Sequence, residues 1–186
     1  MSIVKLHDRA LETVTAIVAN VERSQFGLPT PCAEFDVRAL LNHMIGGNHR
    51  FVAIANGEPG ASVPATGDFV DDDALTPYRE SADALSEAWS EPALLERTVH
   101  LPFGDFPGEM ALGIHTVEVV VHGWDLANAT GQPTELDPEL YEVAWQHTKD
   151  LDDSFRGTGG PFGAAVTVPA GATDTDRLMA WLGRQP

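Results

Sequence analysis

Residues 112–125 read LGIHTVEVVVHGWD, and their pattern predicts a helix that is buried on two sides. At about 100° per residue, apolar side chains gather on two separate faces of this helix. One face carries Met110, Ile114, Val117, Val121 and Trp124, and the other carries Leu112, Val119 and Leu126. The narrow arc between the faces carries His115, Glu118, His122 and Asp125. A helix that is apolar on both flanks is normally buried, so we expect these four polar side chains to lie in the interior.

Glu118 and His122 are four residues apart, so their side chains meet across one helical turn. A buried carboxylate is costly unless it is paired or bound to a metal. A carboxylate and an imidazole one turn apart are ligands that a divalent metal takes from a single helix. We interpret the pair as half of a metal site. The alternative is a hydrogen-bonded couple that holds its helix against a neighbour.

A third ligand is expected from a facing helix, because a reactive zinc-type site has three protein ligands and an open position. His43 is the best candidate: it lies at the margin of an apolar helix face, where Gly46 and Gly47 leave room for a close approach. His49 projects about 120° away from that position. The alternative for His43 is a histidine at the border of the core, bonded to a backbone carbonyl.

His115 and Asp125 are expected to support the metal site rather than to bind the ion. His115 is two turns from His122, a rise of roughly 10 Å, which is too far for one ion to take both. It would line the pocket, carry a proton or hydrogen-bond Glu118. Asp125 would orient His122 through the second ring nitrogen, or would serve a structural role by bonding a backbone amide or Arg38. Both alternatives stay open at this point.

Other reactive side chains offer weaker signals. Cys32 lies in a Pro-Cys turn, and we expect a small buried hydrophobe there rather than a nucleophile or a ligand. Three histidines have no convergent partners in the sequence and are expected to be surface or packing residues, namely His7, His100 and His147. No residue is assigned as catalytic or as binding an organic cofactor.

The composition narrows the class of protein. The chain has 186 residues with 11 Lys and Arg against 28 Asp and Glu, a net charge of −17. Such a charge repels phosphate backbones and anionic lipid, so we expect neither nucleic acid nor membrane as a partner. The single cysteine excludes an internal disulfide framework and is typical of a reducing cytoplasm. No signal peptide or membrane span is expected.

Helical periodicity recurs along the chain and predicts one domain over residues 1–186. Expected helices cover residues 4–23, 36–57, 75–89, 110–130 and 137–151, with Asp36 and Asp137 as N-caps and Gly131 as a stop. A short hairpin over residues 98–106, turning at Gly104-Asp105, and a small C-terminal extension complete the fold. Residues 57–72 and 157–163 are predicted loops, the first a candidate rim or lid. The pattern indicates an all-α four-helix bundle.

Two segments resemble a known family. Residues 29–43, PTPCAEFDVRALLNH, resemble the opening of actinobacterial metal-binding proteins related to the N-terminal domain of mycothiol-dependent maleylpyruvate isomerase, in the DinB-like superfamily. Residues 118–131, EVVVHGWDLANATG, look like the second signature of that group. Residues 162–169 and 176–184 are similar to its C-terminal segment. The family commonly has Trp where this chain has Phe35.

The resemblance implies a DinB-like four-helix bundle with a metal held by His43, Glu118 and His122. Better-understood members use a low-molecular-weight thiol, mycothiol or bacillithiol. A divalent cation binds thiolate and so lowers the thiol pKa. Zinc is expected first, and nickel, iron and manganese also suit such ligands. The isomerases carry an additional C-terminal domain for which this chain has no room, so we do not expect activity on maleylpyruvate itself.

These observations lead to three hypotheses for the function of the protein. The leading hypothesis is a metal-dependent, thiol-using transferase or isomerase that acts on a small electrophile. The second is a non-catalytic metal-containing module that binds a small ligand or responds to stress. The third is a structural bundle in which the three ligand candidates form a buried polar network. A homodimer through an exposed apolar helix face is compatible with all three.

Overall fold

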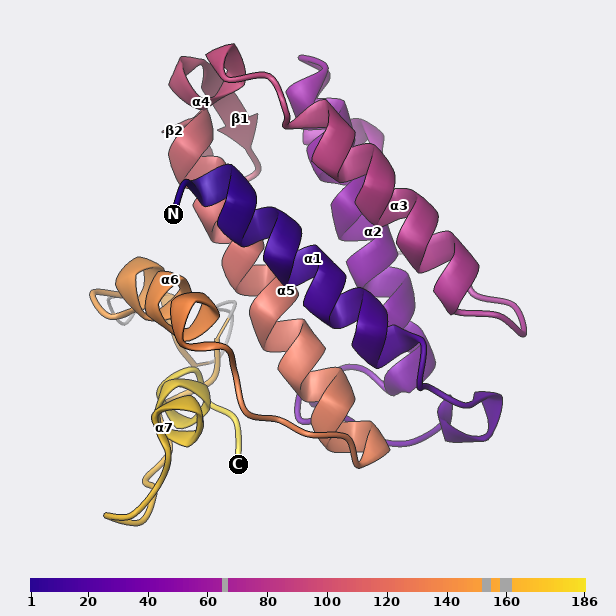
Figure 1. Cartoon of the computed structure of the whole chain (residues 1–186), viewed down its shortest axis with the longest axis vertical. Coiled ribbons are helices and arrows are strands. Elements are labelled where there is room, and N and C mark those ends of the chain that lie inside the picture. The colour runs from indigo at the N-terminus through magenta and orange to yellow at the C-terminus, as the bar shows by residue number, and fades with distance from the viewer. Residues whose placement is uncertain (65–66, 152–154, 158–161) are drawn as a thin grey trace.

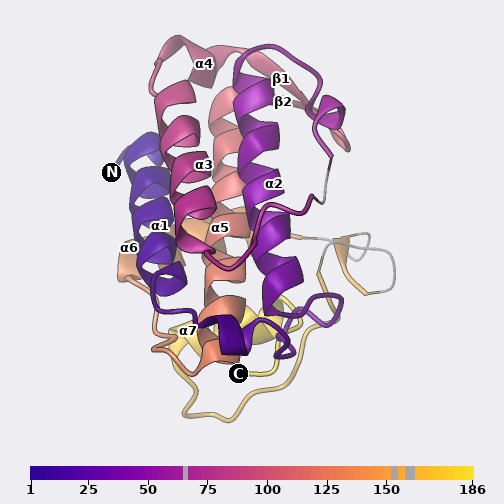
Figure 2. The same ribbon diagram turned by 90° about the vertical axis from the view of Figure 1, so that its right-hand side faces the viewer.

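The computed structural model describes residues 1–64, 67–151, 155–157 and 162–186, and its main feature is a bundle of long helices (Figure 1). Four helices form it: α1 (Ile3–Val18), α2 (Val37–Ala55), α3 (Leu75–Ala88) and α5 (Gly108–Thr130). Both α1 and α2 pack against α3 and α5, so the four helices close into a ring (Figure 2). The all-α four-helix bundle predicted from the sequence is confirmed.

Local signals fix the ends of the two helices that carry the metal-ligand candidates. The Asp36 carboxylate accepts a hydrogen bond from the Ala39 N–H at 2.8 Å and starts α2, as predicted. Gly131 ends α5 in the left-handed conformation with φ 71°, also as predicted. Most of α5 is buried, Leu112 and Leu126 completely. The bundle is therefore assembled around a helix that touches protein on almost all sides.

A two-stranded hairpin lies at one end of the bundle. Strands β1 (Thr98–Leu101) and β2 (Gly104–Pro107) pair antiparallel, with Leu101 opposite Gly104. The turn therefore falls on Pro102 and Phe103, and the prediction of a turn at Gly104-Asp105 was wrong. Proline favours a turn because its φ is fixed and it has no N–H to donate. The hairpin follows a single helical turn, α4 (Ala93–Glu96), which the periodicity did not predict.

The C-terminal part adds a second layer outside the ring. Helix α6 (Pro138–Thr148) packs on α5 and α1, and α7 (Asp174–Trp181) packs on α6 (Figure 1). The predicted cap holds, because the Asp137 carboxylate accepts from the Glu139 N–H. The extended piece expected near Val166 is represented by one bond from its N–H to the Ala180 carbonyl. Within the predicted loops, residues 65–66 and 158–161 lie outside the described residues.

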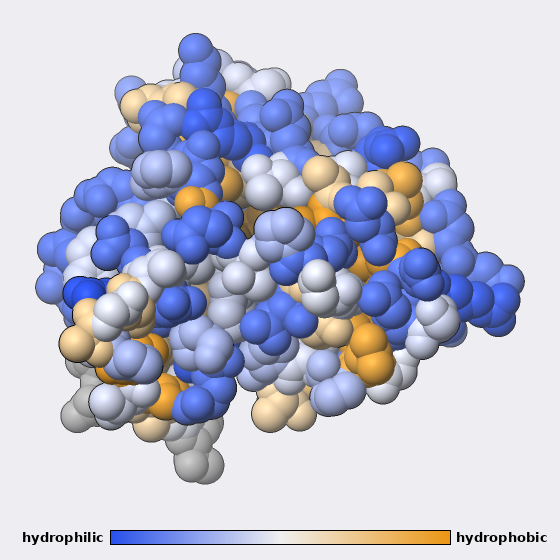
Figure 3. All heavy atoms as spheres, turned by 60° about the horizontal axis from the view of Figure 1, so that its bottom comes forward, coloured by the Kyte–Doolittle hydropathy of each residue, from blue (hydrophilic) through white to orange (hydrophobic). Residues whose placement is uncertain are grey.

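The surface on the lower face of the molecule is predominantly polar, and its apolar atoms form small separate groups (Figure 3). Large hydrophobic side chains among the described residues that are exposed are Met1, Leu28, Phe103, Met110 and Phe155. In the part of the chain that the structure describes, no helix combines the length and the apolar character needed to cross a bilayer.

Gly123 provides a test of the α1–α5 contact. A Cβ at Gly123 would overlap the Cγ2 methyl of Val14, which is buried on α1. We expect Gly123→Ala to lower the free energy of unfolding by about 1–3 kcal/mol through overpacking, although alanine is the better helix former by about 1 kcal/mol. Urea denaturation measures the change.

The double variant Gly123→Ala/Val14→Ala should recover part of the loss, because it removes the overlapping methyl. Gly27→Ala is the control, since a Cβ there meets nothing within 4 Å. Unchanged stability in Gly123→Ala alone would show that α1 and α5 do not approach as closely as described.

Candidate metal centre

A cavity of about 110 Å³ lies between α2, α3, α5 and the tip of the hairpin. All three predicted ligands line it: His43 from α2, and Glu118 and His122 from α5. The predicted pocket residue His115 lines it too. A larger hollow of about 430 Å³ lies between α1 and α5, and none of these residues lines it. The predicted trio and His115 therefore line one cavity, although His43, Glu118 and His122 are not among the groups of described residues whose potential ligand atoms all lie within 4.8 Å of one another.

The two histidines of the trio face each other across the helix interface. The rings of His43 and His122 lie 5.0 Å apart between centroids, at an interplanar angle of 86°. Phe35 stacks on the other side of His43, with centroids 4.9 Å apart and an angle of 27°. Burial lowers the pKa of His43 to about 4, and the nearby His122 and Arg50 act in the same direction. His43 is therefore neutral near pH 7 and keeps a lone pair for a ligand.

Glu118 differs from its expected environment. Its side chain is exposed to solvent where α5 borders the cavity, so the prediction of a dry interior position was wrong. The helix is apolar on both flanks, but the arc between them opens into a hollow. Protein still surrounds the carboxyl closely enough that desolvation raises its pKa, and His122 and Arg50 act against that shift. Glu118 is accessible and is held near positive or proton-donating groups.

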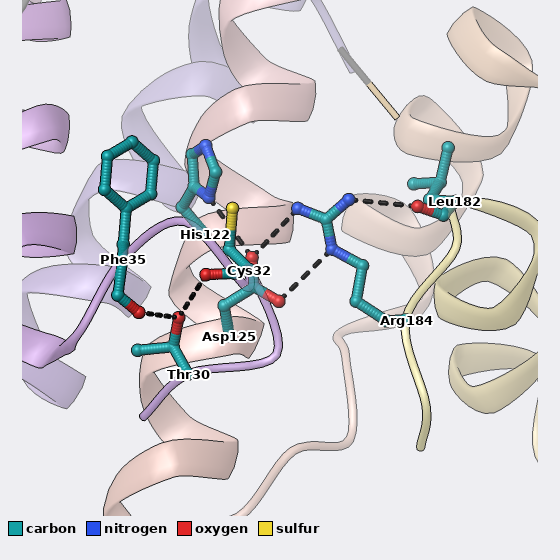
Figure 4. Close-up of polar contacts among 7 residues, drawn as sticks. All are labelled: Thr30, Cys32, Phe35, His122, Asp125, Leu182 and Arg184. Atoms are coloured by element: carbon teal, nitrogen blue, oxygen red, sulfur yellow. Dashed lines mark hydrogen bonds and ion pairs between the residues drawn. The ribbon is translucent and has the colours of Figure 1, made fainter. Parts of the chain in front are cut away.

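Asp125 is fully buried one turn after His122, and two partners satisfy it (Figure 4). Its Oδ2 lies 3.2 Å from His122 Nδ1. The Arg184 guanidinium donates to both oxygens, from Nε to Oδ1 at 3.2 Å and from Nη2 to Oδ2 at 3.0 Å. Burial opposes the charge of Asp125, but the hydrogen bonds from His122 and Arg184 hold its pKa below the ordinary value. Two roles were considered for Asp125: to orient His122, or to bond a backbone amide or Arg38. The structure contains the contact with His122 that the first role requires.

The Asp125 contact determines which nitrogen of His122 is free. A carboxylate accepts hydrogen bonds, so Nδ1 of His122 is the donor to Asp125, and the lone pair of a neutral ring would then lie on Nε2. The structural partner considered for Asp125 was Arg38, but Arg38 donates to Asp68 at 2.8 Å instead. Arg184 was not predicted as a partner of Asp125, because it lies 59 residues further along the chain and no periodicity connects the two positions.

Cys32 lies beside this network and is only partly buried, whereas a small buried hydrophobe was expected at this position. Among the described residues, Cys32, His122 and Asp125 form a group whose potential ligand atoms all lie within 4.8 Å of one another. The thiol is half-buried, and burial raises its pKa while Arg184 acts in the opposite direction (Figure 4). Cys32 is held there by its turn, where Thr30 donates to the carbonyls of Cys32 and Phe35. It offers sulfur as an alternative ligand on the far side of His122.

His115 is bonded to His7 rather than to Glu118. His7 Nε2 and His115 Nδ1 lie 3.0 Å apart, and both side chains are buried. Phe51 packs on His115 with ring centroids 4.1 Å apart. Burial lowers the pKa of His7 to about 4 and lowers that of His115 well below its ordinary value. His7 therefore has a convergent partner that the sequence did not reveal, because α1 and α5 are far apart in the chain.

The other two histidines that had no predicted partner are peripheral. His100 is exposed and pairs with Asp105 across the hairpin at 2.6 Å. His147 bonds the Val143 carbonyl within α6 and lies against Gly113 of α5. Neither of these two histidines lines the cavity.

Breaking the buried ion pair should cost far more stability than breaking an exposed one. Replacement of Arg184 by Met leaves the Asp125 charge buried with His122 alone, and we expect a loss of about 3–5 kcal/mol in unfolding free energy. The control is Arg23→Met, which removes an exposed pair with Asp72 and should cost less than about 1 kcal/mol. Guanidinium denaturation of both variants gives the comparison, and equal losses would contradict the structural role of the pair.

The buried His7 should make the protein less stable in mild acid. Its pKa is about 4 in the folded chain and near 6.5 in the unfolded chain, so the unfolded state binds the extra proton between these values. Stability should therefore fall as pH drops from 6.5 to 4, with His7 contributing at most about 1.4 kcal/mol per pH unit. Urea melts across this range should show a shallower slope for His7→Gln than for wild type. The exposed control His100→Gln should keep the wild-type slope, and an unchanged slope in His7→Gln would refute the assignment.

Comparison with known proteins adds evidence independent of this geometry. Residues 7–127 match the family model described as the mycothiol maleylpyruvate isomerase N-terminal domain. Two uncharacterized proteins of Mycobacterium tuberculosis, MT0763 of strain CDC 1551 / Oshkosh and Rv0738 of strain H37Rv, are each 36% identical to this chain over 179 residues. Each alignment covers 96% of this chain and 95% of the relative.

Two solved structures share the fold. The crystal structure of the mycothiol-dependent maleylpyruvate isomerase matches with a TM-score of 0.66 at 16% identity. A histidine-to-alanine mutant of that isomerase matches with a TM-score of 0.60 at 18% identity. Both alignments cover 78% of this chain and 66% of the isomerase chain, so this chain spans about two thirds of the isomerase length. At these identities the likeness concerns the fold.

Proposed function

The chain belongs to the family of the mycothiol maleylpyruvate isomerase N-terminal domain, and from that membership we propose a divalent-metal protein that uses a low-molecular-weight thiol against a small electrophile. The observation that carries the proposal is the convergence of His43, Glu118 and His122 on one cavity. The three residues come from two facing helices, which is how helical bundles assemble metal sites in their cores. A thiol of the mycothiol or bacillithiol type is the proposed partner.

The chemical types of the three side chains support the proposal of a divalent ion. Two imidazoles and one carboxylate form a donor set that suits zinc first, and also nickel, iron or manganese. The contact between His122 and Asp125 matches the common pattern in which a carboxylate holds the second nitrogen of a metal-binding histidine. A bound cation would supply one piece of chemistry, which is to favour the thiolate over the thiol near neutral pH.

Other residues of this chain would position the proposed ligands and limit what enters the cavity. Phe35 would hold the His43 ring by stacking, and Asp125 would hold the tautomer of His122. The cavity, at about 110 Å³, is smaller than the roughly 300–1,000 Å³ typical of sites for drug-sized ligands. We therefore propose that only the sulfur-bearing end of the thiol and a compact electrophile enter it. The proposed location is the cytoplasm, where a thiol stays reduced.

A second ligand arrangement competes with the first. Cys32, His122 and Asp125 already lie close together, and a soft thiolate ligand would suit zinc. Against this arrangement, Asp125 accepts both hydrogen bonds from Arg184 and one from His122, so its lone pairs are largely engaged. We therefore place His43 and Glu118, rather than Cys32 and Asp125, in the proposed ligand set.

Metal analysis of a set of variants tests the ligands. Wild type purified under metal-replete conditions should contain about one divalent ion per chain, and His43→Ala and His122→Ala should lose it. Glu118→Gln should bind much more weakly because the amide is isosteric but uncharged. Cys32→Ala should retain the ion. Elemental analysis and helical circular dichroism together measure metal content and folding.

The metal contents of these variants distinguish the two ligand sets from each other and from a metal-free polar network. Loss of metal in Cys32→Ala with retention in His43→Ala would move the site to the cysteine side of His122. An ion-free wild type would leave the trio as a polar network. A turnover assay distinguishes an enzyme from a metal-containing binding module. The rate at which mycothiol or bacillithiol is consumed in the presence of an added electrophile should be higher for wild type than for Glu118→Gln only if the protein is an enzyme.

A further inference from the structure

The hydroxyl of Tyr78 stands out among the polar groups of the cavity. Tyr78 lies on α3, is 0% exposed and lines the cavity with the proposed metal ligands. Its hydroxyl oxygen is buried and has no hydrogen-bond partner among the described residues. A buried hydroxyl without a partner destabilises a fold, and nearly all such groups in proteins are satisfied. This hydroxyl therefore has a bond to offer to a molecule that enters the cavity.

The cavity that Tyr78 lines has apolar side chains in its wall as well as the charged Glu118 and Arg50. Met44, Phe51 and Ile54 supply apolar wall. His115 has its Nδ1 engaged by His7, and its Nε2 lies 3.9 Å from the place of a Cβ at Gly47, another residue of the wall. Burial raises the pKa of Tyr78, so its hydroxyl keeps the proton and acts as a donor. A ligand that meets this wall needs apolar surface and one acceptor atom.

We propose that Tyr78 is the donor of a subsite that takes the neutral carbonyl oxygen of a compact ligand. A neutral carbonyl is favoured over a carboxylate because Glu118 lines the same cavity and the chain carries a net charge of −17. The one cationic side chain in the cavity lining, Arg50, lies near enough to Glu118 to act on its pKa, which reduces its attraction for a second anion. The subsite rests on the proposed function in one respect: the compact ligand is taken to be the electrophile of that function.

Two matched probes test the subsite in the full chain without any thiol. Acetamide offers a neutral carbonyl, and acetate offers a carboxylate of nearly the same size. Ligand-observed NMR titrations would give their affinities for wild type, Tyr78→Phe and Tyr141→Phe, with and without Zn²⁺. The control is apt because the chain has two tyrosines, and Tyr141 lies on α6 away from the cavity. Labelling with 3-fluorotyrosine would give two fluorine signals, assigned by these variants.

We expect acetamide to bind wild type and Tyr141→Phe equally and Tyr78→Phe about tenfold more weakly. Without Zn²⁺, acetate should bind all three more weakly than acetamide does. Acetamide should shift the fluorine signal of Tyr78 and leave that of Tyr141 in place. The melting temperature of ligand-free Tyr78→Phe should equal or exceed that of wild type, because the variant removes an unsatisfied buried group.

Equal acetamide affinity in Tyr78→Phe would overturn the subsite, as would an unmoved Tyr78 signal. Binding of neither probe would mean that the hydroxyl serves only water, which also overturns it. Tighter binding of acetate through Tyr78 would overturn the neutral specificity. Failure of the proposed function would appear separately, as absent metal or absent thiol consumption, because neither probe needs the metal or the thiol.

Discussion

The buried charge of Asp125 is the constraint on which the rest of the structure depends. Helix α5 packs against α1, α2 and α6, and the Asp125 carboxylate, at 0% exposure, has no access to bulk water. A charge in that position is tolerated only if it is paired and hydrogen-bonded. Arg184 provides the pairing from the C-terminal end of the chain, which must therefore fold back against the bundle. The remaining bond of Asp125 goes to His122, so one ion pair serves both the tertiary structure and the candidate site.

The fold was predictable where local chemistry decides it. The period of apolar residues in α5, the Asp36 cap and the Gly131 stop each depend on a few neighbouring residues, and each matches the structure. Errors occurred where the elements are too short to show a period. Helix α4 is one turn long, and the hairpin turn depends on whether Pro102 or Gly104 occupies it. At that length, glycine and proline are equally good turn residues in the sequence, and pairing with β1 decides between them.

Residues of the candidate site could be predicted only from the spacing and apolar faces of individual helices. Glu118 and His122 share a face because of helical spacing, and His43 was found because its helix has an identifiable apolar margin. Cys32 meets α5 from a turn, His7 from α1 and Arg184 from the C-terminal end, and no periodicity indicates which residue of α5 each of them meets. The exposure of Glu118 was missed for a related reason. The apolar pattern shows that a helix is surrounded, but it does not show that the surrounding elements leave a hollow beside one arc.

The walls of the cavity come from two kinds of backbone. The proposed ligands and Tyr78 lie on long helices, whereas Leu101, Pro102 and Phe103 belong to the hairpin tip. Phe103 is 58% exposed, so its replacement disturbs little of the packed interior. Under the proposed function, the residues that would bind the metal and those of the hairpin tip belong to parts of the chain that can vary independently. Descendants of such a protein could then acquire new ligands by drift in a two-residue turn, while the proposed metal ligands are inherited unchanged.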